Sequence, residues 1–108
     1  AGPHRGDVLI RVAGRLAREV LSRGQQKLMA VALTLAQLRL LKEVLETTPT
    51  LLLDDPAAEL DAEHLEYFVR QIAPLGCQLV ITSLQPRIPA FGAPDRVFHV
   101  EQGRVGPV

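Results

Sequence analysis

The sequence predicts an α/β fold with a parallel sheet, and three observations lead to this prediction. An unbroken apolar run, Leu51–Leu53, leads directly into Asp54 and Asp55. A second short apolar run follows at Gln78–Thr82, and the segment between the two runs has helical spacing of its apolar residues. A strand, a helix and a strand in this order form a βαβ unit with parallel strands and a right-handed crossover. Unbroken apolar runs of this length are typical of strands buried on both faces.

The first elements expected along the chain form a hairpin. Apolar side chains alternate with others over residues 8–12, which is a strand pattern. Ala13 and Gly14 supply a turn, and Arg15–Val20 can return as the second strand.

A long helix is expected to follow, from Ser22 to about Glu46. Ser22 and Gln25 have the spacing of a capping box at its start. The apolar positions are wider than one stripe, so we expect the helix to be buried along much of its length. Gly24 costs about 1 kcal/mol in a helix interior relative to Ala, which suggests that something approaches the backbone there. The free amides at this end, with Arg23, can bind an anion, although an ordinary capped helix accounts for the same residues.

Two further elements complete the expected fold. Asp61 is the expected N-cap of a helix over Ala62–Ala73. Arg96–Glu101 and Arg104–Val105 are expected to pair as a closing hairpin. No linker divides the chain, so residues 1–108 are expected to form a single unit.

The composition excludes several classes of protein. The chain has 108 residues and one cysteine, so an internal disulfide is excluded, and its histidines show no metal-ligand spacing. No apolar run approaches the ~18 residues of a membrane span, and a cytoplasmic location fits. Residues 1–42 carry eight basic and two acidic side chains, whereas residues 43–108 carry four and ten. This separation suggests an anion and a cation bound near one another, although two patches that neutralise each other account for it equally well.

The adjacent acids Asp54 and Asp55 suggest cation chemistry. Two neighbouring carboxylates repel each other, and partial burial would increase that cost. A bound Mg²⁺ would relieve it at Asp54, and Asp55 could then orient a water for attack on a phosphate. A strand followed by an acidic, solvated turn is the alternative interpretation.

The order of these motifs resembles the C-terminal part of an ABC-type ATPase head. Leu21–Gln25 is similar to the signature motif, Leu51–Asp55 to the Walker B strand, and Ala58–Asp61 to the D-loop. Ser83 falls where many such ATPases carry the switch histidine. The resemblance implies a parallel βαβ core with a long signature helix and flanking hairpins.

Within this superfamily the chain resembles the RecF family of bacterial DNA replication and repair proteins. The residues that carry the resemblance are Gly2-Pro3-His4-Arg5, Arg23, Asp55 and Glu59. Arg23 stands at the third signature position, where transporter ATPases have Gly. Asp55 follows the Walker B aspartate, where transporter ATPases have Glu. Gly6 departs from the family, which usually has an acid there.

The resemblance implies a role for each candidate site residue. The residues that would contact ATP across a dimer interface are Leu21, Ser22, Arg23, Gly24 and Gln25. Asp54 would serve Mg²⁺, Asp55 would polarise the attacking water, Ser83 would stand at the switch position, and Asp61 would cross the dimer interface.

One expected motif is absent. No G-x-x-x-x-G-K-[ST] loop occurs in the chain, although that loop cradles the phosphates of ATP. The resemblance therefore implies a C-terminal fragment that is inactive alone, within a parent ATPase. That parent would form an ATP-dependent homodimer and bind gapped or junction DNA. It would work with RecR in recombinational repair and the SOS response, and it would have no membrane partner.

Two other functions remain open at this stage. One is the matching part of a transporter's ATP-binding subunit, against which Arg23, Asp55 and Ser83 all count. The other is a non-catalytic interaction domain that keeps the fold and has lost the chemistry. The intact Ser22, Asp54 and Asp55 argue against such a loss in the parent, but the isolated fragment would behave in this way.

Overall fold

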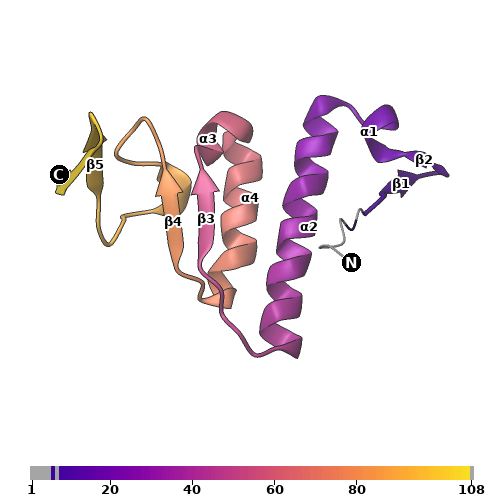
Figure 1. Cartoon of the computed structure of the whole chain (residues 1–108), viewed down its shortest axis with the longest axis horizontal. Coiled ribbons are helices and arrows are strands. Elements are labelled where there is room, and N and C mark those ends of the chain that lie inside the picture. The colour runs from indigo at the N-terminus through magenta and orange to yellow at the C-terminus, as the bar shows by residue number, and fades with distance from the viewer. Residues whose placement is uncertain (1–5, 7, 108) are drawn as a thin grey trace, which may run out of the picture. The chain divides into compact units, whose positions relative to one another are not determined.

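The computed structural model describes Gly6 and residues 8–107, and it mixes helices and strands as expected for the α/β class. The Gly2–Arg5 segment, which carries part of the RecF resemblance, lies outside the described residues. The chain divides into two compact units, Ala1–Thr34 and Leu35–Val108. Figure 1 shows the order of their elements.

The first unit holds a short antiparallel hairpin. Strand β1 (Arg11–Val12) pairs with β2 (Arg15–Leu16) across Ala13 and Gly14, whose φ values are 52° and 80°. Positive φ at both central residues is the geometry of a type I′ turn, which matches the twist of paired strands.

The prediction of a strand over Arg15–Val20 is correct for Arg15 and Leu16 but wrong for the rest, which forms helix α1 (Ala17–Val20). The backbone N–H of Ala17 donates to the Ile10 carbonyl oxygen at 2.8 Å, and the Ala17 side chain is buried. Ala, Arg and Glu at positions 17–19 are good helix formers, which favours this turn.

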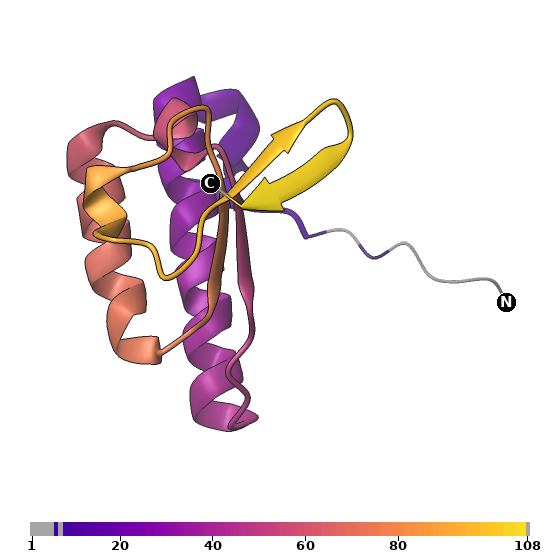
Figure 2. The same cartoon turned by 90° about the vertical axis from the view of Figure 1, so that its left-hand side faces the viewer.

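The second unit is built on two parallel strands. Strand β3 (Leu51–Asp54) pairs in parallel with β4 (Leu79–Thr82), in a register that sets Asp54 beside Thr82. Short helix α3 (Pro56–Glu59), helix α4 (Ala62–Ile72) and the 3₁₀ turn η1 (Ala73–Leu75) connect them. Figures 1 and 2 show α4 running alongside one face of the strand pair.

A small core lies between α4 and the end of helix α2 (Arg23–Val44). The buried side chains of this core are Leu35, Leu38, Leu65, Phe68 and Ile72. Two polar contacts hold the same surfaces together: the Arg39 guanidinium donates to Gln71 Oε1, and Lys42 Nζ donates to the Leu75 carbonyl oxygen at 2.6 Å.

Helix α2 is less buried than its sequence predicts. Leu35 and Leu38 are its only buried side chains among the described residues, and Leu33, Leu40 and Val44 are exposed. The prediction that it would be buried along much of its length is therefore wrong for this chain.

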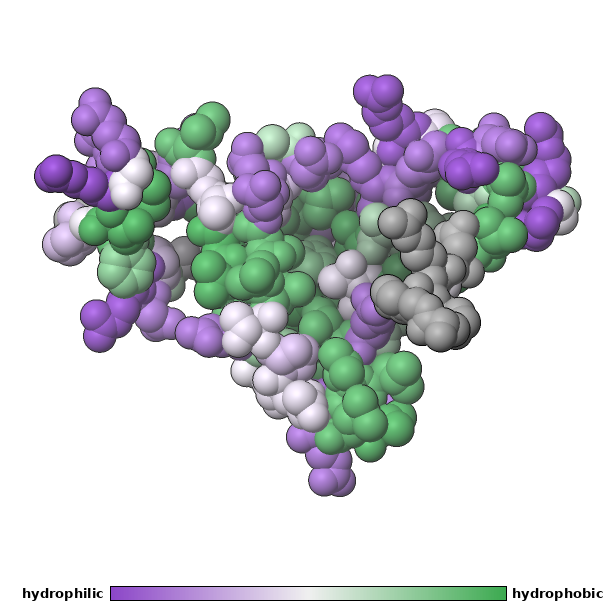
Figure 3. Space-filling model, viewed as in Figure 1, coloured by the Kyte–Doolittle hydropathy of each residue, from purple (hydrophilic) through white to green (hydrophobic). Residues whose placement is uncertain are grey.

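The other face of the β3–β4 pair is open. Leu52 is 72% exposed and Val80 is 48% exposed, and Figure 3 shows apolar side chains gathered over these two strands. The prediction that β3 is buried on both faces is wrong here, because the described residues supply a helix on one face only. Parallel sheets in α/β proteins are covered on both faces, so this face lacks a usual partner.

The chain closes with a second antiparallel hairpin. Strand β5 (Phe98–Glu101) pairs with β6 (Arg104–Pro107) across Gln102 and Gly103, both at positive φ. A short 3₁₀ turn, η2 (Pro89–Phe91), precedes it and contacts α4. None of the described helices has the length and apolar character needed to span a membrane.

Candidate functional site

The start of α2 is closed by a reciprocal pair of hydrogen bonds. The backbone N–H of Gln25 donates to Ser22 Oγ at 3.2 Å, and the backbone N–H of Ser22 donates to Gln25 Oε1 at 2.9 Å. This confirms the predicted capping box. Next to it, the Gln26 side-chain amide donates to the carbonyl oxygens of Arg18 and Leu21 at 3.0 Å each, which ties α1 to α2.

Gly24 leaves open space at this helix start. A Cβ built on Gly24 would meet no heavy atom of the described residues within 4 Å, and its φ is not positive. Nothing described in this chain approaches the backbone closely, so the sequence-based expectation is not met within the chain itself. Neither crowding nor an unusual φ explains why position 24 is glycine.

The two acids meet at a third residue, Thr82. The Thr82 hydroxyl donates to Asp54 Oδ1 and accepts the backbone N–H of Asp55 at 3.0 Å, and the same N–H lies 3.1 Å from the Thr82 carbonyl oxygen. The sequence analysis did not select Thr82. The signal was the parallel register of the two apolar runs, which sets the end of one strand beside the end of the other.

Asp55 has an unusual backbone. Its φ of 44° and ψ of 57° lie in the left-handed region, which costs an ordinary L-residue about 1–2 kcal/mol. Pro56 follows as the first residue of α3 and is buried, so the chain turns sharply at the strand end. Strained residues of this kind gather at functional sites, where the surrounding hydrogen bonds hold them.

The carboxylate oxygens at this strand end suit Mg²⁺ only if waters and phosphate oxygens supply its remaining ligands. The described residues contain no cluster of three or more His, Cys, Asp and Glu side chains that could hold a metal. Asp54 is exposed and Asp55 is half-buried, so their carboxylate oxygens are open to a ligand. Mg²⁺ commonly takes one or two carboxylates and completes its shell with waters and phosphate oxygens, and this pair fits that pattern.

Asp61 is fixed at the start of α4. Its Oδ1 accepts the backbone N–H of His64 at 2.8 Å, as expected for an N-cap, and His64 Nδ1 lies 2.8 Å from both carboxylate oxygens. These bonds, first the backbone one and then the imidazole one, lower the pKa of Asp61. The carboxylate therefore stays ionised at neutral pH.

Ser83 is exposed directly after β4. Its Oγ accepts the backbone N–H of Gln85 at 3.0 Å within a local turn. The hydroxyl proton takes no part in that bond, so Ser83 keeps a donor for another group.

The structure thus brings the candidate residues together in two groups. Leu21–Gln25 belong to the first unit, at the α1–α2 junction. The acids Asp54 and Asp55 belong to the second unit, where Thr82 joins them and Ser83 follows.

Comparison with known proteins shows which proteins the chain is similar to. The curated relatives that it matches are DNA replication and repair proteins. Each of them is RecF: the chain is 41% identical, over 97% of its length, to RecF of Shewanella sp. (strain MR-4), of Shewanella pealeana and of Shewanella baltica. The resemblance to the RecF family that its motifs predicted is thereby confirmed.

The match has a clear limit. The chain spans about 30% of the length of these relatives. No protein-family model and no solved structure matches it.

Proposed function

We propose that this chain is the C-terminal part of the ATPase head of a RecF-like protein that acts in DNA replication and repair. The observation that carries the proposal is the 41% identity to RecF over 97% of the chain. The order of the signature-like helix start, the acidic strand end and the D-loop-like segment supports the ATPase assignment.

In this proposal the start of α2 binds the γ-phosphate held by a second head. Ser22 Oγ already accepts the N–H of Gln25, which leaves its own hydrogen free to donate to a phosphate oxygen. The open space over Gly24 allows an anion to reach the free amides of the first turn, where the helix dipole favours negative charge. Leu21 and Arg23 flank these groups, and the exposed Arg23 adds positive charge.

The strand end would hold the cation and the water. When bound, Mg²⁺ neutralises charge on the phosphates. Asp54 would contribute one oxygen to it, in an orientation that the Thr82 hydroxyl fixes. Asp55 would accept a hydrogen bond from the attacking water, and its pinned backbone would keep that carboxylate in place.

The remaining candidates would act between heads. Asp61 would cross the interface as an ionised carboxylate, which suits contact with a cation or an amide. Ser83, at the switch position, would donate its free hydroxyl proton toward the phosphate.

The parent would therefore be a cytoplasmic, ATP-dependent homodimer that binds gapped or junction DNA. It would work with RecR to support recombinational repair, including the SOS response. This chain alone lacks a phosphate-cradling loop, so we propose that it does not hydrolyse ATP by itself.

Substitution of the second acid in the full-length parent tests the proposal. Asp55→Asn keeps the side-chain shape but removes the charge that orients water, so hydrolysis falls steeply while ATP binding and dimer formation remain. Asp95→Asn makes the same change at an exposed loop residue and serves as the control. A turnover rate in Asp55→Asn equal to that of the Asp95→Asn control would overturn the assigned role.

A further inference from the structure

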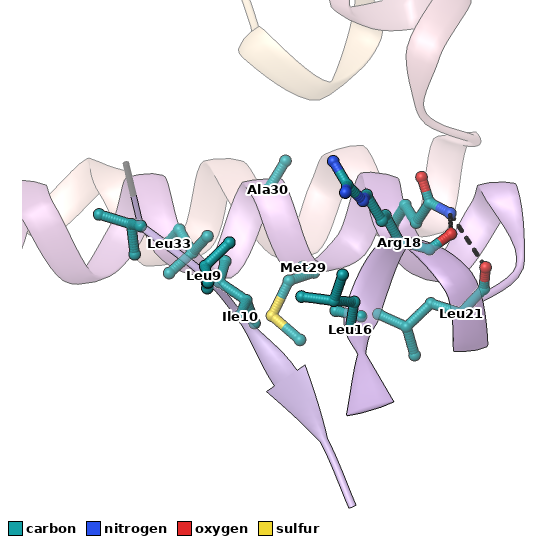
Figure 4. A pocket seen from close by; sticks show the side chains of 11 residues that line it. Leu9, Ile10, Leu16, Arg18, Leu21, Met29, Ala30 and Leu33 are labelled. Atoms are coloured by element: carbon teal, nitrogen blue, oxygen red, sulfur yellow. Dashed lines mark hydrogen bonds between the residues drawn. The ribbon is translucent and has the colours of Figure 1, made fainter. Parts of the chain in front are cut away.

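An apolar groove lies in the first unit, between the hairpin, α1 and the start of α2 (Figure 4). Its volume is about 270 Å³. Its larger apolar lining side chains include Leu9, Ile10, Leu16, Leu21, Met29 and Leu33. Leu9 is 59% exposed and Leu33 is 44% exposed, so this surface is open to a partner.

The polar side chains of the groove include one charged group, the guanidinium of Arg18. Among the described residues that line it, Gln26 and Arg18 are the two with polar side chains. The Gln26 amide nitrogen is used by its two bonds to backbone carbonyls, as the dashed lines in Figure 4 mark. Arg18 makes no ion pair with any described carboxylate. The groove therefore offers apolar contact beside one available guanidinium group.

The first unit carries more basic than acidic side chains. Arg15 and Arg23 are exposed in the same unit, and Glu19 is the only acidic residue among residues 8–34. None of the described residues that line the groove is acidic. A partner with carboxylates would be attracted, and one with lysines or arginines would be repelled.

We propose that this groove binds an acidic amphipathic helix of a partner protein. Apolar side chains on one face of that helix would enter between Leu9, Met29 and Leu33, and a neighbouring Asp or Glu would pair with Arg18. Met29 lies in the floor, and its flexible thioether adapts to partner side chains of different shape.

The openness of the groove favours a helix over a small molecule. Pockets for small molecules usually bury most of their ligand, whereas this groove is open to solvent. Amphipathic helices bind such grooves through a few apolar anchors at positions i, i+3, i+4 and i+7. A nucleic-acid backbone would use the arginines but would leave the apolar floor unpaired.

Binding of synthetic peptides to the 108-residue chain tests the proposal. One probe is a fluorescent helical peptide with leucines at i, i+3, i+4 and i+7 and glutamates beside them; the matched probe has lysines in place of the glutamates. We expect fluorescence anisotropy to show saturable binding of the acidic peptide, about tenfold tighter than the basic one. Amide chemical shifts should change at Leu21, Met29 and Leu33.

Three variants sharpen the test. Arg18→Glu should weaken binding of the acidic peptide by up to about fivefold, which is the upper end for an exposed ion pair. It should also remove the preference for the acidic over the basic peptide. Leu33→Ser should weaken both peptides. Arg87→Glu makes the same charge change at an exposed loop position outside the groove and should have no effect.

Other outcomes would overturn the proposal. These are no saturable binding of the acidic peptide, equal binding of both peptides to the unmodified chain, or shift changes confined to residues outside the groove. Binding of a short single-stranded DNA oligonucleotide at Arg15, Arg18 and Arg23, without binding of the acidic peptide, would identify a polyanion surface instead.

Discussion

Replacing Gly24 with alanine separates what this chain needs at the start of α2 from what its parent needs. The added methyl group would meet no heavy atom of the described residues within 4 Å, and the backbone of Gly24 is helical with a negative φ. Alanine at such a position stabilises a protein by about 0.4–1 kcal/mol, chiefly because the unfolded chain loses freedom. At the first helical turn we take the lower end of that range.

This gain has a measurable size. A change of 1 kcal/mol shifts the melting temperature of a 60–100-residue domain by about 4–8 °C, so Gly24→Ala should raise it by about 2–3 °C. Gly76→Ala is the matched control, because its Cβ would also meet nothing within 4 Å but its φ is 68°. A left-handed alanine costs about 1–2 kcal/mol, so this control should lower the melting temperature.

The same Gly24→Ala substitution should harm the parent. If a phosphate must reach the first turn of α2 from a second head, the methyl group occupies its path. ATP-driven dimerisation should weaken, which sedimentation with a non-hydrolysable ATP analogue measures. Calorimetry of the 108-residue chain measures whether Gly24→Ala raises its melting temperature. A lower melting temperature would show that the space over Gly24 is not open. Normal dimerisation of the parent variant would refute the assigned role of Gly24.

Three further predictions follow from the site. In the parent, Ser22→Arg should block ATP-driven dimerisation without reducing nucleotide binding to the monomer, and sedimentation that shows a normal dimer would contradict this. Because the pKa of Asp61 is lowered in the folded chain, its stabilisation is present above the unfolded pKa of about 3.9 and is lost as pH falls through the folded value. Thermal melts of Asp61→Asn should therefore lose less stability than the unmodified chain between pH 5 and pH 2 (roughly the window set by that pKa), and parallel curves would count against the Asp61–His64 pairing. Isothermal titration of the chain alone with Mg-ATP should show no tight binding, and micromolar affinity would mean that the missing phosphate loop is not required.

Much of the second unit could be predicted from local sequence. The run Leu51–Leu53 gave a strand at Leu51–Asp54, and Asp61 is the observed N-cap of α4. Each of these depends on neighbours close in sequence, so periodicity and capping rules were sufficient. The capping box of Ser22 and Gln25 was predictable for the same reason.

The errors concern contacts that local sequence does not specify. Burial of Leu52 depends on what lies over β3, and the described residues cover one face only. The strand expected over Arg15–Val20 gave way to a helix at Ala17, whose N–H bonds to Ile10 outside that segment. Thr82 was missed because its role appears only once the register of β3 and β4 is known.

The central claim is that Ser22 of one head acts on the nucleotide whose Asp55 belongs to the other head. Mixing two variants of the full-length parent tests it directly: Ser22→Ala in one protomer and Asp55→Asn in the other. In a mixed dimer, one site then combines an unmodified Ser22 with an unmodified Asp55, and the second site carries both changes. The account predicts that the mixture hydrolyses ATP faster than either variant alone. Equal rates for the mixture and the average of the two variants would contradict it.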